Sequence, residues 1–328
     1  MDRHHTGDES VSPRPIPAGV RTVNDRRRTR TSPAIFATHP RAHASPAYLA
    51  TPRTRPKFHI RVLVEDRYLA HPEPAGATAA LRAVGHDVDL VVAERHVAEL
   101  GVPLGVDVLL ARGRSSALLS LLRAAQAEGI PVVNSATSIS AVADKAGMGA
   151  ALAAAGVPIP HTWIGPVEPL AERADLSFPL VLKPACGDNA RGLVVVRSRA
   201  DLAVVRWTEP VALAQAFHRG DGVDVKLYVA GARIWAVRRP SPVDDDGRCR
   251  PVTTPGEPLP VTPMLAELAR RCGQVFGLQL YGVDCVGTMT WPLVIEVNDY
   301  PNYRGAPGAS EAIADVVTRL ASSPVAPT

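Results

Sequence analysis

The order of strand-like and helix-like segments divides this chain near residue 136. Before that point, short apolar segments with strand character alternate with helical segments. Such alternation requires right-handed crossover connections and produces a parallel sheet flanked by helices. After it, short strands follow one another closely with glycine-containing turns, a pattern typical of antiparallel sheets. The sequence therefore predicts an α/β region followed by an α+β region.

Capping residues, glycines and apolar patterns predict where the helices and strands begin and end. Ser115 and Thr262 are good helix N-caps, the latter followed by a first-turn proline. The helical segment at 137–155 is expected to break near Gly147 and Gly149. Further helices are expected at 73–84 and 309–320, a mobile loop at 240–260, and strands at 58–64, 87–92, 106–111, 131–134, 160–164, 179–184, 192–197, 211–217, 223–230, 232–238, 278–287 and 292–298.

The basic character of the chain is confined to its first 57 residues. These carry 11 Lys and Arg against 4 Asp and Glu, a net charge of +7. The whole chain carries 36 against 32, so the remainder carries 25 against 28, a net charge of −3. Residues 1–57 are rich in proline, arginine and serine without a sustained apolar period, which predicts a disordered basic arm. The nearly neutral body is not expected to bind nucleic acid.

Membrane insertion and disulfide bonding are not expected. No apolar run reaches the roughly 20 residues that a membrane-spanning helix needs. The four cysteines show no CxxC spacing, so neither a zinc site nor a disulfide framework is indicated. A cytoplasmic location is expected.

Lysine is rare in this chain, with four lysines against 32 arginines. Three of them, Lys145, Lys183 and Lys226, lie in Ala-Asp-Lys, Leu-Val-Leu-Lys and Val-Asp-Val-Lys segments. An ammonium binds phosphate as a point charge, and the planar guanidinium of arginine does not replace it cleanly. Chance could leave one lysine on a surface, but three in such segments indicate phosphate-binding positions.

A glycine-rich segment at 186–192 follows Lys183, between two expected strands. Gly187 and Gly192 would let backbone N–H groups approach a phosphate, and Arg191 adds positive charge. The segment matches neither the P-loop nor the dinucleotide-binding motif, both of which lead into a helix. Taken alone, the segment is therefore better interpreted as a simple hairpin turn, with phosphate binding as the alternative.

Two adjacent strands carry a candidate metal site. In the segment 293–298, alternation places Glu296 and Asn298 on one face of the strand. Asp284, on the neighbouring strand, can face the same point. Two carboxylates and an amide oxygen suit Mg²⁺ that bridges phosphates. The alternative, a buried polar cluster without a cation, is disfavoured because the carboxylates would repel each other.

Together these segments resemble the ATP-grasp superfamily along nearly all of residues 58–320. The resemblance implies that Lys145 and Lys183 contact ATP phosphates, and that the strand with Gln215 and Phe217 is the hinge that holds the adenine. It further implies that Asp284, Glu296 and Asn298 bind magnesium and that Lys226 and Arg239 lie near the transferred phosphate.

Two branches of this superfamily share motifs with the chain. Segments 107–112, 129–134, 144–145 and 187–192 resemble the RimK-type glutamate-adding ligases, whereas 215–218, 226–229, 239–241 and 298–305 resemble the inositol-polyphosphate kinases. Arg238, Asn302 and Arg304 are the candidate substrate-binding residues. An inositol polyphosphate would need a dense cationic pocket, so the net charge of −3 and the three lysines of the body favour a carboxylate substrate.

The resemblance therefore predicts an ATP-grasp fold, with a small parallel α/β domain and two antiparallel lobes that clasp ATP. The α/β domain is expected at 58–136 and the ATP-grasp domain at 137–328, with a lid lobe at about 157–217 and a C-terminal lobe at about 218–320.

The expected reaction joins a small-molecule carboxylate, or a peptide terminus, to an amine through an acyl phosphate, with release of ADP and phosphate. Its cofactors would be ATP and one or two Mg²⁺ ions, for which Mn²⁺ could substitute. A small-molecule kinase of the inositol-phosphate type is the alternative and would differ in the acceptor pocket. An ATP-binding scaffold would need a broken metal set, and the set here is whole. An oligomer is compatible with the sequence.

Overall fold

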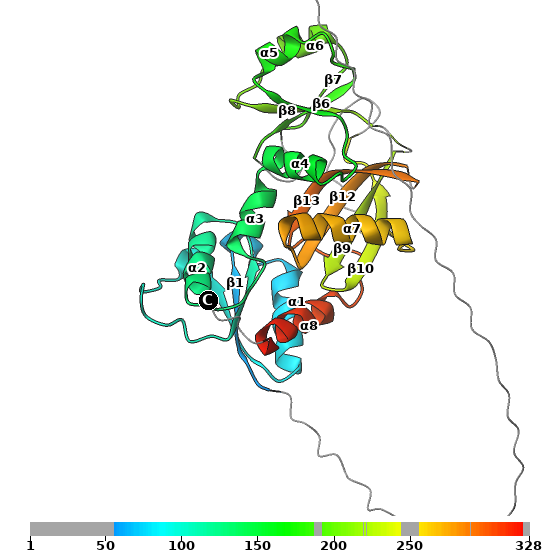
Figure 1. The fold of residues 1–328 in the computed structure, drawn as a ribbon. Helices are drawn as coiled ribbons and strands as arrows, with labels where there is room; N and C mark the ends of the chain where they lie inside the picture. The colour runs from blue at the N-terminus through cyan, green and yellow to red at the C-terminus, as the bar shows by residue number, and fades with distance from the viewer. Residues whose placement is uncertain are drawn as a thin grey trace, which may run out of the picture. The chain divides into compact units, whose positions relative to one another are not determined.

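The computed structural model describes residues 56–186, 192–218, 220, 222–243, 256–288 and 290–323, which form three β-sheets and their helices (Figure 1). The predicted disordered arm at 1–57 lies outside the described residues except for its last two positions. Within the described ranges, no helix combines the length and the apolar character needed to cross a membrane.

The first sheet is parallel, with the order β2-β1-β3-β4, as the alternation of strands and helices predicts. The Ser115 side chain caps α2 by accepting a hydrogen bond from the Leu118 N–H at 3.3 Å. The elements are β1 (His59–Val64), η1 (Asp66–Tyr68), α1 (Pro72–Ala83), β2 (Asp87–Val92), η2 (Ala93–Arg95), β3 (Val108–Arg112), α2 (Ser116–Ala127) and β4 (Val132–Val133). The chain proceeds from β1 and from β3 toward opposite edges, so the carboxyl ends of these two strands form a topological switch point.

The helical segment predicted at 137–155 is two helices, α3 (Ala136–Ala143) and α4 (Lys145–Ala154). The predicted break near Gly147 and Gly149 is wrong, because the chain turns at Asp144 instead. Asp144 has an extended backbone, and its side chain caps α4 by accepting from the Ala146 N–H at 2.9 Å. A Cβ atom at Gly147 would lie 2.8 Å from the Asp144 carboxylate, so the glycine leaves room for this cap.

The second sheet is antiparallel, with the order β5-β8-β6-β7. Its strands are β5 (Thr162–Gly165), β6 (Leu180–Pro184), β7 (Val194–Val196) and β8 (Ala212–Ala216). Two helices, α5 (Val167–Glu172) and α6 (Arg199–Val204), pack against it in a core of their own. The sequence pattern does not predict them, because six residues are too few to show a helical apolar period.

The third sheet is antiparallel, with the order β11-β10-β9-β12-β13. Its strands are β9 (Val223–Ala230), β10 (Arg233–Pro240), β11 (Glu257–Leu259), β12 (Leu280–Thr288) and β13 (Trp291–Asp299). β11 falls inside the predicted loop at 240–260, because its three residues become a strand only by pairing with β10. Residues 244–255 of that loop lie outside the described residues.

One face of the third sheet is covered by α7 (Pro263–Phe276), which lies across it in Figure 1. Thr262 caps α7 by accepting from the Leu265 N–H at 3.2 Å, as predicted. Gly277 ends it in the left-handed conformation, with φ of 64°, which glycine adopts without steric cost.

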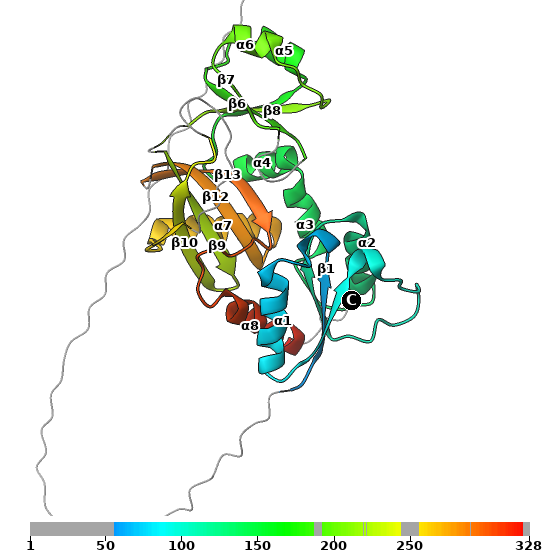
Figure 2. The same cartoon turned by 180° about the vertical axis from the view of Figure 1, so that it is seen from behind.

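The last helix, α8 (Ala309–Ser322), lies beside α1 (Figure 2). Its Ile313 and Val317 enter a core that also contains Val62 of β1, Leu81 of α1 and Tyr228 of β9. The helix predicted to close the C-terminal lobe therefore completes the core of the α/β region.

Candidate functional site

The third sheet has one apolar face and one polar face. Because side chains alternate along a strand, every second residue of β9, β10, β12 and β13 points away from α7. Val225, Leu227 and Val283 belong to the core on the α7 side. The opposite face carries Asp224, Lys226, Tyr228, Arg239, Asp284, Glu296 and Asn298, which lie on four adjacent strands.

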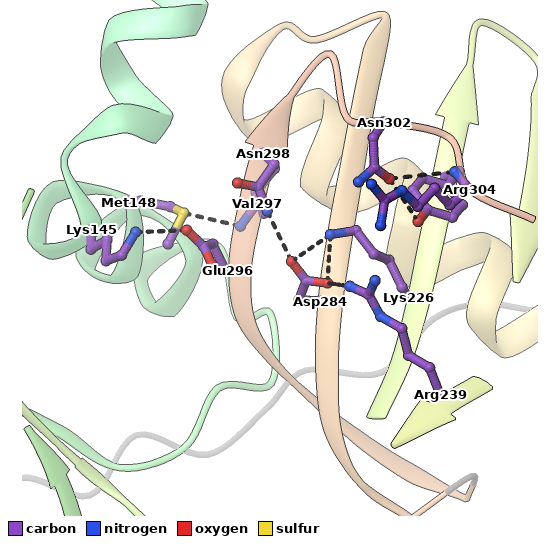
Figure 3. Close-up of polar contacts among 11 residues, drawn as sticks. Lys145, Met148, Lys226, Arg239, Asp284, Glu296, Val297, Asn298, Asn302 and Arg304 are labelled. Carbon is purple, nitrogen blue, oxygen red and sulfur yellow. Dashed lines mark hydrogen bonds and ion pairs between the residues drawn. The ribbon is translucent and has the colours of Figure 1, made fainter. Parts of the chain in front are cut away.

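Asp284 lies at the centre of the polar face and has three partners (Figure 3). Lys226 Nζ lies 2.9 Å from its Oδ1 and 3.1 Å from its Oδ2. Arg239 Nη2 lies 3.6 Å from Oδ1, and Asn298 Nδ2 donates a hydrogen bond to Oδ2 at 2.9 Å. The structure thus brings two residues predicted for catalysis against two residues predicted as metal ligands.

Glu296 forms a second ion pair next to this cluster. It lies directly opposite Asp284 in the β12–β13 ladder, and its Oε1 accepts from Lys145 Nζ at 2.6 Å (Figure 3). Lys145 is the first residue of α4, and its backbone N–H donates to the Ala185 carbonyl at 2.9 Å, just past β6. The turn at Asp144 therefore places Lys145 between the end of β6 in the second sheet and Glu296 in the third sheet.

Lys183 and Gln215 lie on neighbouring strands of the second sheet. Lys183 Nζ donates to Gln215 Oε1 at 2.7 Å, and Gln215 Nε2 donates to Thr162 Oγ1 at 3.1 Å. Burial lowers the pKa of Lys183 to about 8, and the Glu296 carboxylate opposes this shift. Lys145, Lys183 and Gln215 together line a narrow cleft of about 20 Å³ whose other walls include Leu213 and Ile295.

Tyr228 connects the polar face to the loop after β13. Its hydroxyl donates to Asn302 Oδ1 at 3.3 Å, and Lys226 Nζ lies 5.8 Å from the centre of its ring. Asn302 Oδ1 also accepts from the Arg304 backbone N–H at 3.4 Å (Figure 3), while the Arg304 residue is exposed. Of the predicted substrate residues, Asn302 therefore lies one side chain away from Lys226.

The structure does not bring every predicted residue to the polar face. Arg238 is exposed and, as the neighbour of Arg239 on β10, points to the opposite face of the sheet. Phe217 follows β8, and its backbone N–H donates to the Pro179 carbonyl at 3.0 Å. Gly192 has a φ of 76°, as a tight turn requires, whereas Gly187 and Arg191 lie outside the described residues.

Asp224 is a member of the polar face that the sequence analysis misses. It lies opposite Arg239 in the β9–β10 ladder and hydrogen-bonds to the Ser241 side chain. Burial raises the pKa of Asp224 to about 6; the hydrogen bond opposes this shift, and the Asp284 charge adds to it. A signal for it exists, because alternation in 223–226 places Asp224 on the same face as Lys226.

The donor set of the polar face suits Mg²⁺ bound together with a nucleotide. Among the described residues, no three His, Cys, Asp or Glu side chains are grouped closely enough to hold a metal ion by themselves. The protein supplies two facing carboxylates, Asp284 and Glu296, and the amide of Asn298. Mg²⁺ is commonly held by one or two carboxylates and substrate phosphates, with waters completing its octahedron.

Comparison with known proteins identifies a shared domain and two kinds of relative. Residues 142–316, more than half of the chain, match the RimK-like ATP-grasp domain. A probable alpha-L-glutamate ligase of Pasteurella multocida (strain Pm70) is 27% identical over 192 residues, which cover 56% of this chain and 61% of that protein. Inositol-tetrakisphosphate 1-kinase 2 of Glycine max is 28% identical over 185 residues, which cover 47% of this chain and 57% of that protein. The chain thus matches less than two thirds of the length of either relative.

Two solved structures resemble almost the whole described part of the chain. The RimK domain protein ATP-grasp from Sphaerobacter thermophilus DSM 20745 has a TM-score of 0.62 and 25% identity, and the match covers 78% of this chain and 99% of that one. The ATP-grasp ligase PsnB, complexed with a minimal precursor, Mg and ADP, has a TM-score of 0.60. It is 19% identical, and the match covers 80% of this chain and 97% of that one, a likeness that shows the fold alone.

Proposed function

The chain belongs to the RimK-like ATP-grasp family, and from this premise we propose that it joins a carboxylate to an amine with ATP and Mg²⁺. The fold class expected from the sequence is confirmed, since the parallel sheet and two antiparallel sheets match ATP-grasp structures. Relatives named as ligases support this reaction class. A reaction that consumes ATP is consistent with the predicted cytoplasmic location.

The observation that carries the proposal is the charge balance of the polar face and the adjoining cleft. Four cations, Lys145, Lys183, Lys226 and Arg239, stand against three carboxylates, Asp224, Asp284 and Glu296. ATP bound with two Mg²⁺ ions is neutral, so one excess positive charge matches one small anionic group such as a carboxylate. An inositol polyphosphate carries many more negative charges, which would require many more cations.

The proposed reaction has two steps. A carboxylate oxygen of the substrate attacks the γ-phosphorus of ATP, and the bond from this phosphorus to the bridging oxygen breaks, which yields an acyl phosphate and ADP. The amine nitrogen then attacks the acyl carbon, the carbon–oxygen bond to phosphate breaks, and the amine loses a proton as the amide forms. Both steps shift negative charge among phosphate oxygens, so the protein acts mainly by positioning and charge neutralisation.

The residues of the site have distinct proposed roles. Lys226 and Arg239, fixed on adjacent strands, would neutralise the transferring phosphoryl group. Lys145 and Lys183, which line the cleft, would contact the α- and β-phosphates. Mg²⁺, held by Asp284, Glu296 and Asn298, would supply charge neutralisation at the phosphate oxygens. The nucleotide contacts of Gly187, Arg191, Gly192, Gln215 and Phe217 and the substrate contacts of Arg238, Asn302 and Arg304 stay predictions.

A small-molecule kinase is the second candidate. It is favoured by the match to the kinase of Glycine max and by the segment 298–305, which follows the proposed metal ligands. Such an enzyme would use the same nucleotide site and transfer the γ-phosphoryl group to an acceptor hydroxyl.

The two candidates differ in the fate of the γ-phosphate. The protein would be incubated with γ-labelled ATP, Mg²⁺ and pools of carboxylates, amines and inositol phosphates. The ligase proposal expects labelled free phosphate only when a carboxylate and an amine are both present. Label in an organic product would establish the kinase instead. Lys183→Ala should abolish ATP turnover whether the protein is a ligase or a kinase. Arg270→Ala, a change of an exposed residue on α7, should leave ATP turnover unchanged.

A further inference from the structure

A second cavity lies away from the nucleotide cleft. It has a volume of about 230 Å³ and is bounded by the first residues of α1, the first residues of α8 and the loop after β13. Glu73, Asn302, Tyr303, Ser310 and Glu311 are among the residues that line it. The cavity is large enough for a small organic molecule, and Asn302 is the one lining residue to which a substrate role is assigned above.

Glu73 is the unusual member of this lining. The residue is only 8% exposed, and its Oε2 is buried without a hydrogen-bond partner. Among the described residues, His71 is its ion-pair partner, with Nδ1 3.8 Å from Oε2, and a histidine supplies a positive charge only when it is protonated. A buried carboxylate is costly unless a donor or cation compensates it. The side chain therefore lacks the partner that its environment requires.

Other buried polar atoms without partners gather on the same side of the molecule. Four such atoms occur among the described residues, and besides Glu73 Oε2 they include Arg112 Nε and Tyr300 Oη. The Arg112 guanidinium lies 5.3 Å from the centre of the Tyr300 ring, and the charge of Glu73 adds to the burial that raises the pKa of Tyr300. Arg112 ends β3, at the topological switch point of the first sheet, where α/β proteins commonly bind ligands.

The sign of the charge at the cavity selects a cation. Glu73 and Glu311 are its charged lining residues, and no lysine or arginine is among the described residues that line it. Each helix N-terminus contributes a partial charge of roughly +0.5, which the full negative charge of each glutamate exceeds. Arg233 Nη1 would lie 3.6 Å from a Cβ atom at Gly308, next to Glu311, so the uncompensated negative charge of the cavity is that of Glu73.

The cavity lies close to the proposed reaction centre. Asn302 lines it and accepts a hydrogen bond from Tyr228, whose ring lies against Lys226. A ligand in the cavity is thus separated from the Lys226–Asp284 pair by the Asn302 and Tyr228 side chains. The cavity is therefore adjacent to the proposed reaction centre, with these two side chains between them.

We propose that this cavity binds the acceptor amine as an ammonium ion, with Glu73 as its counter-ion. The role of the cavity in turnover rests on the ligase function proposed above. The chemical class is a small primary amine, bound before it loses the proton that attack requires. Selection against polyanionic acceptors follows from the negative charge of the cavity.

Binding of amines to the nucleotide-free protein tests the proposal without any turnover. Calorimetric titration would compare ethylamine, 1,4-diaminobutane and alanine amide with the uncharged propanol and propionamide. At least one amine should bind, and the uncharged compounds should bind at least tenfold more weakly. Glu73→Gln should weaken amine binding at least tenfold, Glu73→Asp should weaken it less, and Glu99→Gln, an exposed change elsewhere, should have no effect. Amines that bind no better than the uncharged compounds, or equally well to Glu73→Gln, would overturn the proposal.

Kinetics separate this proposal from the ligase proposal. If the label experiment shows a ligase, Glu73→Gln should raise KM for the amine at least tenfold and leave KM for ATP unchanged. If the protein is an active ligase but Glu73→Gln leaves KM for the amine unchanged, the proposal that the cavity binds the amine is refuted and the ligase proposal stands. Label transferred to an organic product would refute the ligase, and the calorimetric result would still decide whether the cavity binds amines.

Discussion

Lys183 lies in an environment that disfavours its charged, protonated form. It is 9% exposed, its Nζ donates a hydrogen bond to the neutral amide of Gln215, and burial lowers its pKa to about 8. A bound phosphate would favour the charged form, so the proposed ATP complex should hold Lys183 protonated. Nucleotide binding is then linked to proton uptake at this residue.

ATP affinity should fall above pH 8 for this reason. The Kd for ATP in the presence of Mg²⁺ should rise by up to about tenfold per pH unit above pH 8, because the free protein must first take up a proton. Lys183→Met should bind ATP about 10- to 100-fold more weakly at pH 7 and lose the pH dependence, whereas Arg270→Ala should follow the wild type. Nucleotide titrations between pH 6.5 and 10 measure both effects. A wild-type Kd that stays constant to pH 10 would contradict the assignment.

The same depressed pKa affects stability in the opposite direction to the usual lysine. An unfolded lysine keeps its proton up to a pKa of about 10.5, whereas Lys183 in the fold loses it near 8. Between these values the unfolded state binds more protons, so the free energy of unfolding rises with pH through this window. Lys183→Met should flatten that rise in urea denaturation experiments.

Among the elements, β4 and β12 are joined by one side chain. Asn134, 3% exposed, donates through Nδ2 to the Leu280 carbonyl at 2.7 Å. Its Oδ1 accepts from the Gln279 N–H at 2.9 Å and the Leu280 N–H at 3.2 Å. A single amide therefore satisfies three backbone groups at the junction of the parallel sheet and the third sheet.

Removal of this amide should be strongly destabilising. Asn134→Ala removes the acceptor of the Gln279 and Leu280 N–H groups, whereas the Leu280 carbonyl keeps its hydrogen bond from the Tyr300 N–H at 2.9 Å. At about 1–3 kcal/mol for each group that loses its partner, a loss of about 2 kcal/mol or more in the free energy of unfolding is expected. Urea denaturation measures it, with the exposed Arg123→Ala as a control that should change stability by less than about 0.5 kcal/mol. A loss below about 1 kcal/mol for Asn134→Ala would show that the junction does not depend on this side chain.

The sequence predicts those helices and strands whose ends are determined by residues close together in the chain. The caps at Ser115 and Thr262 are predicted because the capping residue and its target lie within three positions. The break at Asp144 is missed because the apolar pattern continues through it, and β11 is missed because it depends on β10. In the site, Asp284, Glu296 and Asn298 come together because they alternate on adjacent strands. Glu73 gives no signal, since its burial depends on α8, far along the chain.

At the scale of the whole molecule, every described core lies after residue 57. The cores of the first and third sheets, their shared core with α8 and the core of the second sheet all draw on residues from Phe58 onward. Since the sequence predicts a disordered arm at 1–57, this arm is not expected to support the fold or the site.

Deletion of residues 1–55 should leave ATP turnover within about twofold and the unfolding temperature within about 2 °C, since the sequence predicts that this arm is disordered. Turnover in the labelled-ATP assay and a thermal melt of the truncated protein measure this. Loss of turnover in a truncated protein that still melts cooperatively would assign a function to the arm.

The position of α8 also determines the order in which the molecule can form during synthesis. β1, α1 and β3 leave the ribosome early, but the core that they begin is completed by Ile313, Val316 and Val317 of α8. One side of the first sheet must therefore stay exposed to solvent, or to a chaperone, while the second and third sheets are translated. One face of the part made first is therefore buried last, whereas its other face is covered early by α2 and α3.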